Sequence, residues 1–122
     1  IDEWQERRKQ IRKYYLDRFS HIKPLRCLSE GFEKHADSKF VVYAGAERDA
    51  LQTWMGQKNI EVKVHYNLPL SEHPVADNLT KPDMMSTSTM LTRSLLSLPM
   101  YPELTDAEVE LVADAVCIFY EP

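Results

Sequence analysis

Apolar residues recur at helical spacing near the start of the chain. In residues 2–19, Trp4, Ile11, Tyr15 and Phe19 follow one another at intervals of seven and four, while arginine and lysine occupy the other side. Because about 3.6 residues complete one helical turn, this pattern predicts an amphipathic helix with one apolar stripe. The stretch RRKQIRK within it is typical of a solvated helix face, and it leaves a nucleic-acid-binding surface as the less favoured alternative.

The same periodicity returns at the end of the chain. Thr105 and Glu108 predict a capping box, in which each side chain bonds the backbone amide of the other residue. Pro99 and Pro102 come just before it and predict a rigid, extended corner, because proline restricts its own φ and the preceding residue. The helix that follows has apolar residues at spacings of three and four: Val109, Val112, Val116 and Phe119.

Shorter elements are predicted between these two helices. KFVVYA (39–44) is β-branched and aromatic, and IEVKVHY (60–66) alternates Val62, Val64 and Tyr66 with polar residues, so each predicts a strand. The intervening ERDALQTWMGQKN predicts a helix with a short apolar stripe, and its final asparagine predicts a left-handed stop.

The remaining stretch combines a loop with a helix that ends as a strand. Residues 67–83 hold three prolines and little pattern, which predicts a loop longer than most connections in compact domains. MMSTSTMLTRSLLSLP predicts a helix that finishes as a short strand near 95–98. Helices thus alternate with a few strands, which predicts an α+β fold: a small two- to three-stranded sheet with helices packed on one face.

Length and composition are those of one globular domain. The chain has 122 residues, of which 43% are hydrophobic and 28% charged, so we expect residues 1–122 to form a single domain. Its first residue is Ile1 rather than methionine, from which we expect a fragment or a processed product. The expected parts are a long linking helix (2–19), an α/β body (39–66), the loop 67–83 and C-terminal helices (84–120).

Charge and cysteine content restrict the expected partners and location. The net charge of −4 argues against nucleic acid as the main partner, because phosphate binding requires a basic face. No apolar run approaches the ~20 residues of a membrane helix, and no signal peptide is visible. Cys27 and Cys117 fit no metal-binding spacing and are typical of reduced thiols in a cytoplasmic protein. A disulfide between them remains the alternative.

Short catalytic motifs are uninformative in this chain. Three glycines cannot build a glycine-rich phosphate loop. His65 and His73 lie eight residues apart without further ligands at metal-binding spacing. No motif indicates a Ser/His/Asp triad, because these three residue types occur in almost any sequence.

Two longer motifs are more informative. VHYNLPL (64–70) joins the end of a predicted strand to a proline-containing loop, and LSLPMYPELTDAEVELVADAV leads into the last helix, which ends in FY. With RRKQIRKYYLDRF and ERDALQTWMGQKNIEVKVHY, these motifs extend over nearly the whole chain. In this respect the sequence resembles the C-terminal small domain of the DegT/StrS family of sugar aminotransferases, which depend on pyridoxal phosphate (PLP).

The resemblance implies a division of roles between two domains. In that family a large N-terminal domain binds PLP and supplies the Schiff-base lysine, and the small domain closes over a keto nucleotide-sugar substrate at a dimer interface. No lysine of this chain lies in a segment that resembles the lysine site, so the resemblance implies no cofactor held by this chain and no transamination by it alone. PLP would belong to the parent enzyme. The implied partners are the missing N-terminal domain, the nucleotide sugar and a second copy in a homodimer.

Three residues correspond to substrate-binding positions of that family. Tyr66 matches the aromatic of its HY pair, which implies a hydroxyl that donates to a phosphate of the sugar nucleotide. His65 precedes it and could face the other side of the strand, and His35 matches the histidine before the strand 39–44. Each also has an ordinary interpretation: a half-exposed strand residue for His65, an aromatic at the core edge for Tyr66 and a loop residue for His35. No residue receives a catalytic, cofactor-binding or metal-binding role.

The chain departs from the family pattern on the substrate side and keeps the packing motifs. The loop motif usually has proline, histidine and glutamine, and the strand usually has an aromatic, an amide and an arginine. This pattern fits a divergent substrate, and it leaves open a second function, a non-catalytic interaction or regulatory module derived from the family. The departures are Asp37, Ser38, Tyr43, Asn67, Ser71 and His73.

Overall fold

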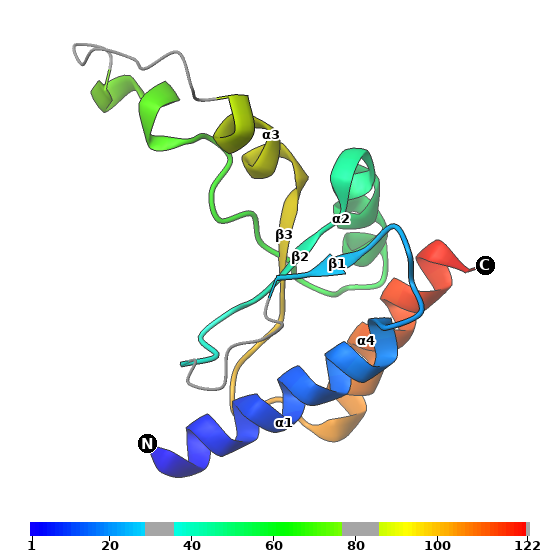
Figure 1. Cartoon of the computed structure of the whole chain (residues 1–122). Helices are drawn as coiled ribbons and strands as arrows, with labels where there is room; N and C mark the ends of the chain where they lie inside the picture. The colour runs from blue at the N-terminus through cyan, green and yellow to red at the C-terminus, as the bar shows by residue number, and fades with distance from the viewer. Residues whose placement is uncertain (29–35, 77–85, 122) are drawn as a thin grey trace.

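The structure is a computed structural model that describes residues 1–28, 36–76 and 86–121. Figure 1 labels the α-helices α and the strands β; the short 3₁₀ turns are named η in the same chain order. They are α1 (Asp2–Phe19), β1 (Arg26–Cys27), β2 (Phe40–Tyr43), η1 (Gly45–Glu47), α2 (Arg48–Gln57), η2 (Leu70–Glu72), η3 (Pro74–Ala76), α3 (Ser86–Ser94), β3 (Leu95–Leu98) and α4 (Asp106–Tyr120).

The three strands form one antiparallel sheet in the order β1-β2-β3. Along β2 and β3, Phe40 lies opposite Leu98 and Val42 lies opposite Leu96. All four side chains are buried, and alternate residues of a strand share a face, so these residues form the covered face of the sheet. Since β2 and β3 are far apart in sequence, their pairing holds the two halves of the chain together.

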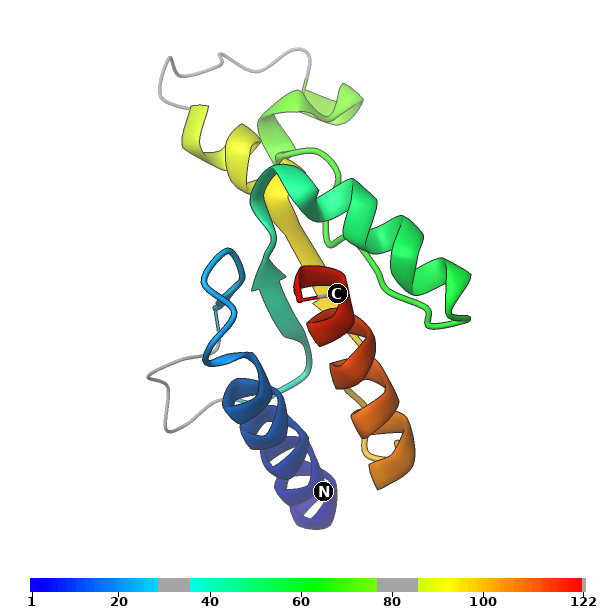
Figure 2. The ribbon, with the colours of Figure 1, turned by 90° about the vertical axis from the view of Figure 1, so that its right-hand side faces the viewer.

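Helices α1, α2 and α4 cover that one face of the sheet, as Figures 1 and 2 show. The buried side chains of sheet and helices belong to a single hydrophobic cluster. Each large apolar side chain in such a cluster contributes about 1.5–3 kcal/mol relative to an exposed one. The predicted fold class is therefore confirmed: α+β, with a small three-stranded sheet and helices on one face.

The centre of the core is an aromatic cluster around Tyr15 of α1. Its ring centroid lies 5.0 Å from that of Phe40 and 5.6 Å from that of Phe19. Its hydroxyl donates to the carbonyl oxygen of Pro99 at 3.1 Å. Burial raises the pKa of Tyr15 well above its usual value, so the hydroxyl remains a donor. Tyr15 therefore attaches α1 both to β2 and to the proline corner.

Helices α1 and α4 lie side by side and run in the same direction. At the start of α4, Arg7 donates from Nη2 to the carbonyl oxygen of Leu104 at 2.6 Å, and its Nη1 lies 2.7 Å from Asp106 Oδ1. Further along both helices, Arg18 pairs with Asp114. These contacts are partly exposed, so they align the helices more than they stabilise them.

The apolar stripe predicted for α1 is confirmed only in the second half of the helix. Trp4 is 56% exposed, so its predicted place in the core is wrong. It precedes Arg7, the residue that contacts the start of α4, and therefore lies beyond the helix that would cover it. The buried residues of the stripe are Ile11, Tyr15 and Phe19.

The strand predicted over 60–66 is wrong. In the structure this segment makes a single bridge to β3, between Lys63 and Ser97. Val62 and Val64 are half-buried against the core, which explains the alternating pattern. Alternation reports that one side of a segment is covered, and it does not report that the backbone is paired along its length.

The short strand β1 was not predicted, because two residues, Arg26 and Cys27, are too few to form a pattern. In the loop predicted over 67–83, the described part contains only the turns η2 and η3. The rest of that loop lies outside the described residues.

The predicted helix ends are confirmed. Asn59 follows α2 with φ 59°, the left-handed conformation that asparagine tolerates. The capping box is present: Glu108 N–H donates to the Thr105 hydroxyl at 3.2 Å, and Thr105 N–H donates to the Glu108 carboxylate at 2.8 Å. The box starts α4 directly after the proline corner and so fixes how the helix leaves the sheet.

We expect Thr105→Ala to lower the free energy of unfolding by about 1 kcal/mol, because the variant loses the hydroxyl that satisfies the Glu108 amide. Urea denaturation measures the change. The matched control is Thr53→Ala on α2, where an exposed hydroxyl donates to the Asp49 carbonyl, and we expect a change within about 0.5 kcal/mol. Equal losses in the two variants would contradict a special contribution from the cap.

Candidate functional site

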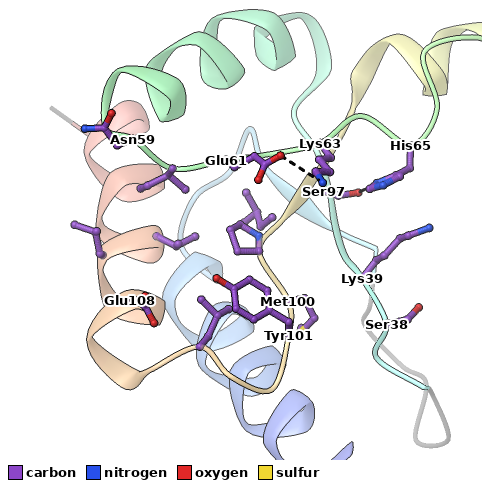
Figure 3. A pocket seen from close by; sticks show the side chains of 16 residues that line it. Ser38, Lys39, Asn59, Glu61, Lys63, His65, Ser97, Met100, Tyr101 and Glu108 are labelled. Atoms are coloured by element: carbon purple, nitrogen blue, oxygen red, sulfur yellow. Dashed lines mark hydrogen bonds and ion pairs between the residues drawn. The ribbon is translucent and has the colours of Figure 1, made fainter. Parts of the chain in front are cut away.

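A cavity of about 500 Å³ opens beside the end of β3 (Figure 3). Its lining comes from the start of β2, the segment after α2, the corner after β3 and one side of α4. The two sides of the cavity differ in chemistry. The side formed by the corner and α4 is largely apolar, with Leu104, Leu111 and Val112. The opposite side, which we call the cationic wall, carries Lys39, Lys63 and His65.

One pair of backbone hydrogen bonds positions the cationic wall. Lys63 N–H donates to the carbonyl oxygen of Ser97 at 3.1 Å, and Ser97 N–H donates to that of Lys63 at 2.8 Å. Two residues further on, His65 Nδ1 lies 2.9 Å from the hydroxyl oxygen of Ser97, a residue that is 6% exposed. In the tautomer whose Nδ1 accepts from this hydroxyl, Nε2–H is a donor that no described residue engages.

The charges around the cavity are unequally compensated. Lys63 Nζ lies 3.3 Å from Glu61 Oε1. The Glu108 carboxylate accepts from the amide and hydroxyl of Thr105, and these bonds lower the pKa of Glu108. The ammonium of Lys39, by contrast, pairs with no carboxylate of the described residues; it lies 5.8 Å from the centre of the Tyr66 ring. Lys39 therefore has the least compensated charge on the cationic wall.

His65 is held in its neutral form by its surroundings. Burial, and then the positive charges of Lys39 and Lys63, lower its pKa below the ordinary value of 6.5. At pH 7 the imidazole is therefore neutral and has one donor and one acceptor nitrogen. This is the form that can bond Ser97 through one nitrogen and a ligand through the other.

The structure places two of the three residues identified from the sequence. His65 lines the cavity, whereas Tyr66 is not among the lining residues and is 69% exposed. The two rings meet edge to face, with centroids 5.7 Å apart. The core-edge interpretation of Tyr66 is therefore wrong, and substrate binding by either residue stays a prediction. The third residue, His35, lies outside the described residues.

Two departures from the family pattern have different structural settings. Asp37 is 2% exposed with φ 46°, and its carboxylate lies 3.4 Å from Arg12 Nε. Its charge is therefore used within the fold, at the turn into β2, where an aspartate tolerates the left-handed conformation. Ser38, one residue later, lines the cavity. The change at residue 38 thus alters the lining of the cavity, and the change at residue 37 alters a buried contact that holds the backbone beside it.

Lys39, Lys63 and Ser97 were not identified from the sequence. Lys63 alternates with Val62 and Val64 and therefore shares a side of the segment with His65, so the alternation contained a signal for it. Ser97 interrupts an otherwise apolar strand, which also marks a special position. No such signal marks Lys39, because a lysine before a strand is an ordinary surface residue.

The described residues alone form neither a metal site nor a complete PLP site. No group of three or more histidine, cysteine, aspartate or glutamate side chains among them is arranged to hold a metal ion. PLP requires a Schiff-base lysine and an acidic or basic partner for its ring nitrogen. Both lysines of the cavity are exposed, Lys63 is paired with Glu61, and Glu108 is engaged by Thr105. We therefore assign no reaction step through PLP to these residues.

Two further expectations concern cysteines and membranes. Cys27 and Cys117 are half-buried and do not form a disulfide with each other. Both pack against the hydrophobic core. Within the described parts of the chain, no helix combines the length and the apolar character needed to cross a bilayer.

Comparison with known proteins assigns the family. The model of the DegT/DnrJ/EryC1/StrS aminotransferase family matches residues 1–117. The chain belongs to this family. The resemblance seen in the sequence motifs is thereby confirmed for almost the full chain.

Two relatives and one solved structure are similar to this chain. A dTDP-3-amino-3,6-dideoxy-alpha-D-galactopyranose transaminase of Aneurinibacillus thermoaerophilus is 30% identical over 95% of this chain and 31% of that protein. A pleiotropic regulatory protein of Geobacillus stearothermophilus is 30% identical over 71% of this chain and 25% of that protein. The crystal structure of S. venezuelae DesV in complex with a ketimine intermediate has the same fold, with TM-score 0.91 and 24% identity over 99% of this chain and 33% of that one. The chain thus spans a quarter to a third of the length of these relatives.

We expect the His65 ring to titrate below pH 6.5, and Lys39→Gln to move its midpoint upward, because the variant loses a neighbouring positive charge. An NMR titration of the imidazole Cε1 proton measures both. Since the folded-state pKa is the lower one, the stability that His65 contributes is present above pH 6.5 and declines as the pH falls. Lys9→Gln, on α1 and paired with Glu6, is the matched control and should leave the midpoint unchanged. A His65 midpoint above 6.5 would contradict this description of the cationic wall.

Proposed function

We propose that this chain is the substrate-facing small domain of a PLP-dependent aminotransferase that acts on a keto nucleotide sugar. In this proposal the chain is one domain with α1 as the linking helix, and a separate large domain binds PLP and supplies the Schiff-base lysine. PLP, when bound there, provides the chemistry that moves the amino group. The residues described here bind, orient and shield the sugar nucleotide. The parent protein acts as a cytoplasmic homodimer.

The observation that carries this proposal is the position of the cavity within a DegT-family chain. The cavity includes His65, and the exposed Tyr66 follows it, with its ring 5.7 Å from that of His65 and 5.8 Å from the Lys39 ammonium. A nucleotide sugar has two negatively charged phosphates and a polar ring, which suit cationic and hydrogen-bonding groups of this kind. The transaminase relative named for a dTDP-amino sugar supports a substrate of the same class.

A second candidate function is a non-catalytic interaction or regulatory module. One relative is called a pleiotropic regulatory protein, and the chain departs from the family pattern at several positions on the substrate side. The packing features, such as the capping box and the proline corner, are kept in the structure. A family scaffold can therefore persist after catalysis is lost.

Expression of the longer protein that contains this chain separates the two candidates. For the enzyme we expect a yellow product that holds PLP and transfers an amino group from an amino-acid donor, such as glutamate, to a keto nucleotide sugar. The 122-residue chain alone should do neither, because the residues that the structure describes do not form a complete PLP site. A colourless longer protein without turnover would favour the regulatory module. PLP bound covalently to the isolated chain, with turnover of an amino donor, would contradict both.

For Tyr66→Phe in the longer protein, we expect the affinity for the nucleotide sugar to weaken by about 0.5–1.5 kcal/mol, because the hydroxyl would no longer bond a phosphate. Isothermal titration calorimetry measures the difference. Tyr14→Phe, in the groove between α1 and α4, is the matched control and should leave the affinity unchanged. Unchanged affinity in Tyr66→Phe would remove this hydroxyl from the site.

A further inference from the structure

We infer that Lys39 is a phosphate-binding residue of this domain and that the cationic wall receives the diphosphate group of the nucleotide sugar. The inference rests on the proposed function for the identity of the ligand. It adds a residue and a position for the charged part of that ligand. Lys39 has no role in the family motifs on which the resemblance was based.

The first argument is charge compensation. Three groups with cationic or donor nitrogen, Lys39, Lys63 and His65, line one side of the cavity and come from two separate segments of the chain. Glu61 offsets the charge of Lys63 at 3.3 Å. The nearest carboxylate along the chain from Lys39, that of Asp37, is buried against Arg12. The positive charge of Lys39 is therefore left for a group outside the described residues.

The second argument is that the contact of Lys39 with the Tyr66 ring is weak enough to be replaced by a bond to phosphate. Its ammonium lies 5.8 Å from the Tyr66 ring centroid, close to the ~6 Å limit of a cation–π contact. An exposed contact of this kind is at the weak end of its range, whereas a charge-assisted bond to phosphate is about twice as strong as a neutral one. A phosphate group can therefore draw the ammonium from the Tyr66 ring into the cavity.

The third argument is the fixed donor beside this lysine. Ser97 holds His65 through Nδ1, and the backbone bridge holds Ser97 against Lys63. In the tautomer in which Nδ1 accepts from Ser97, the Nε2–H donor of His65 is therefore carried on a fixed part of the fold, while Lys39 is an exposed cation on the same wall. A diphosphate has enough acceptor oxygens to bond both groups at once. The exposed Tyr66 ring lies next to them, where the remainder of a nucleotide sugar would continue.

The test is a titration of the chain with inorganic pyrophosphate at low ionic strength, followed through the NMR signals of His65 and the Ser97 amide. We expect saturable shifts at both residues, weaker binding as salt rises, and a loss of roughly three- to tenfold in affinity for Lys39→Gln. Lys39→Arg should retain binding because it keeps the charge. Lys63→Gln should lose less than Lys39→Gln, since Glu61 already offsets its charge. Lys9→Gln on α1 should bind as the unaltered chain does.

The outcomes separate this inference from the proposed function. Absence of shifts with pyrophosphate, or equal affinity in Lys39→Gln and the unaltered chain, would overturn the inference. An uncharged nucleoside serves as the second probe, and dependence of its binding on Lys39 would overturn a phosphate-specific role. None of these measurements involves PLP or amino transfer. A longer protein that transaminates but binds pyrophosphate independently of Lys39 would keep the proposed function and reject the inference. A longer protein whose pyrophosphate binding depends on Lys39 but that does not transaminate would keep the phosphate-binding role of Lys39 and reject the proposed function.

Discussion

Ser97 is held on both sides of β3, and this constraint determines the geometry of the site. On one edge, β3 pairs with β2, where Ser97 lies opposite Val41. On the other edge, two backbone hydrogen bonds join Ser97 to Lys63, and its hydroxyl lies against His65. Within the described residues, the backbone of the segment after α2 pairs with the sheet at this bridge alone. The directions of Lys63 and His65 therefore depend on one residue pair rather than on a full strand.

A second constraint connects this residue to the helices. Tyr15 of α1 packs against Phe40 of β2 and donates to the carbonyl oxygen of Pro99, two residues after Ser97. The proline corner then leads to the Thr105 cap and into α4, which forms the apolar side of the cavity. The same core that stabilises the domain thus sets the distance between the two sides of the cavity. Substitutions in this core are expected to change the site through its geometry.

The sequence predicted the fold well where patterns are long and locally determined. The stop at Asn59 and the capping box involve neighbouring residues, and both are confirmed, as is the apolar stripe in the second half of α1. The incorrect predictions concern burial and strand pairing, which tertiary contacts determine. Trp4 has the right spacing but extends past its covering helix, and 60–66 has the right alternation but bonds β3 at one residue. Neither outcome can be read from a local pattern, because each depends on where another element ends.

The candidate site was predictable in part, for a related reason. Motif resemblance identified His65 and Tyr66, which are adjacent in sequence. Lys39 was missed because it is near them only in space: its ammonium lies 5.8 Å from the Tyr66 ring, and it lines the same cavity as His65 (Figure 3). Its charge stands out only after the partners of its neighbours are known: Glu61 for Lys63 and Arg12 for Asp37. Charge compensation is a property of the folded chain.

The residues that fix the backbone are different from those of the cationic wall, which explains how the chain can depart from its family without losing the fold. The aromatic cluster, the proline corner and the cap fix the backbone, and none of them uses a side chain of the cationic wall. Lys39 and Ser38 are exposed residues at the start of β2, so their replacement costs little in stability. Selection can therefore change charge and hydrogen bonding on this wall while Ser97 and the core keep its position. Of the departures from the family pattern, Ser38 lines the cavity, whereas Asp37 is buried against Arg12 within the fold.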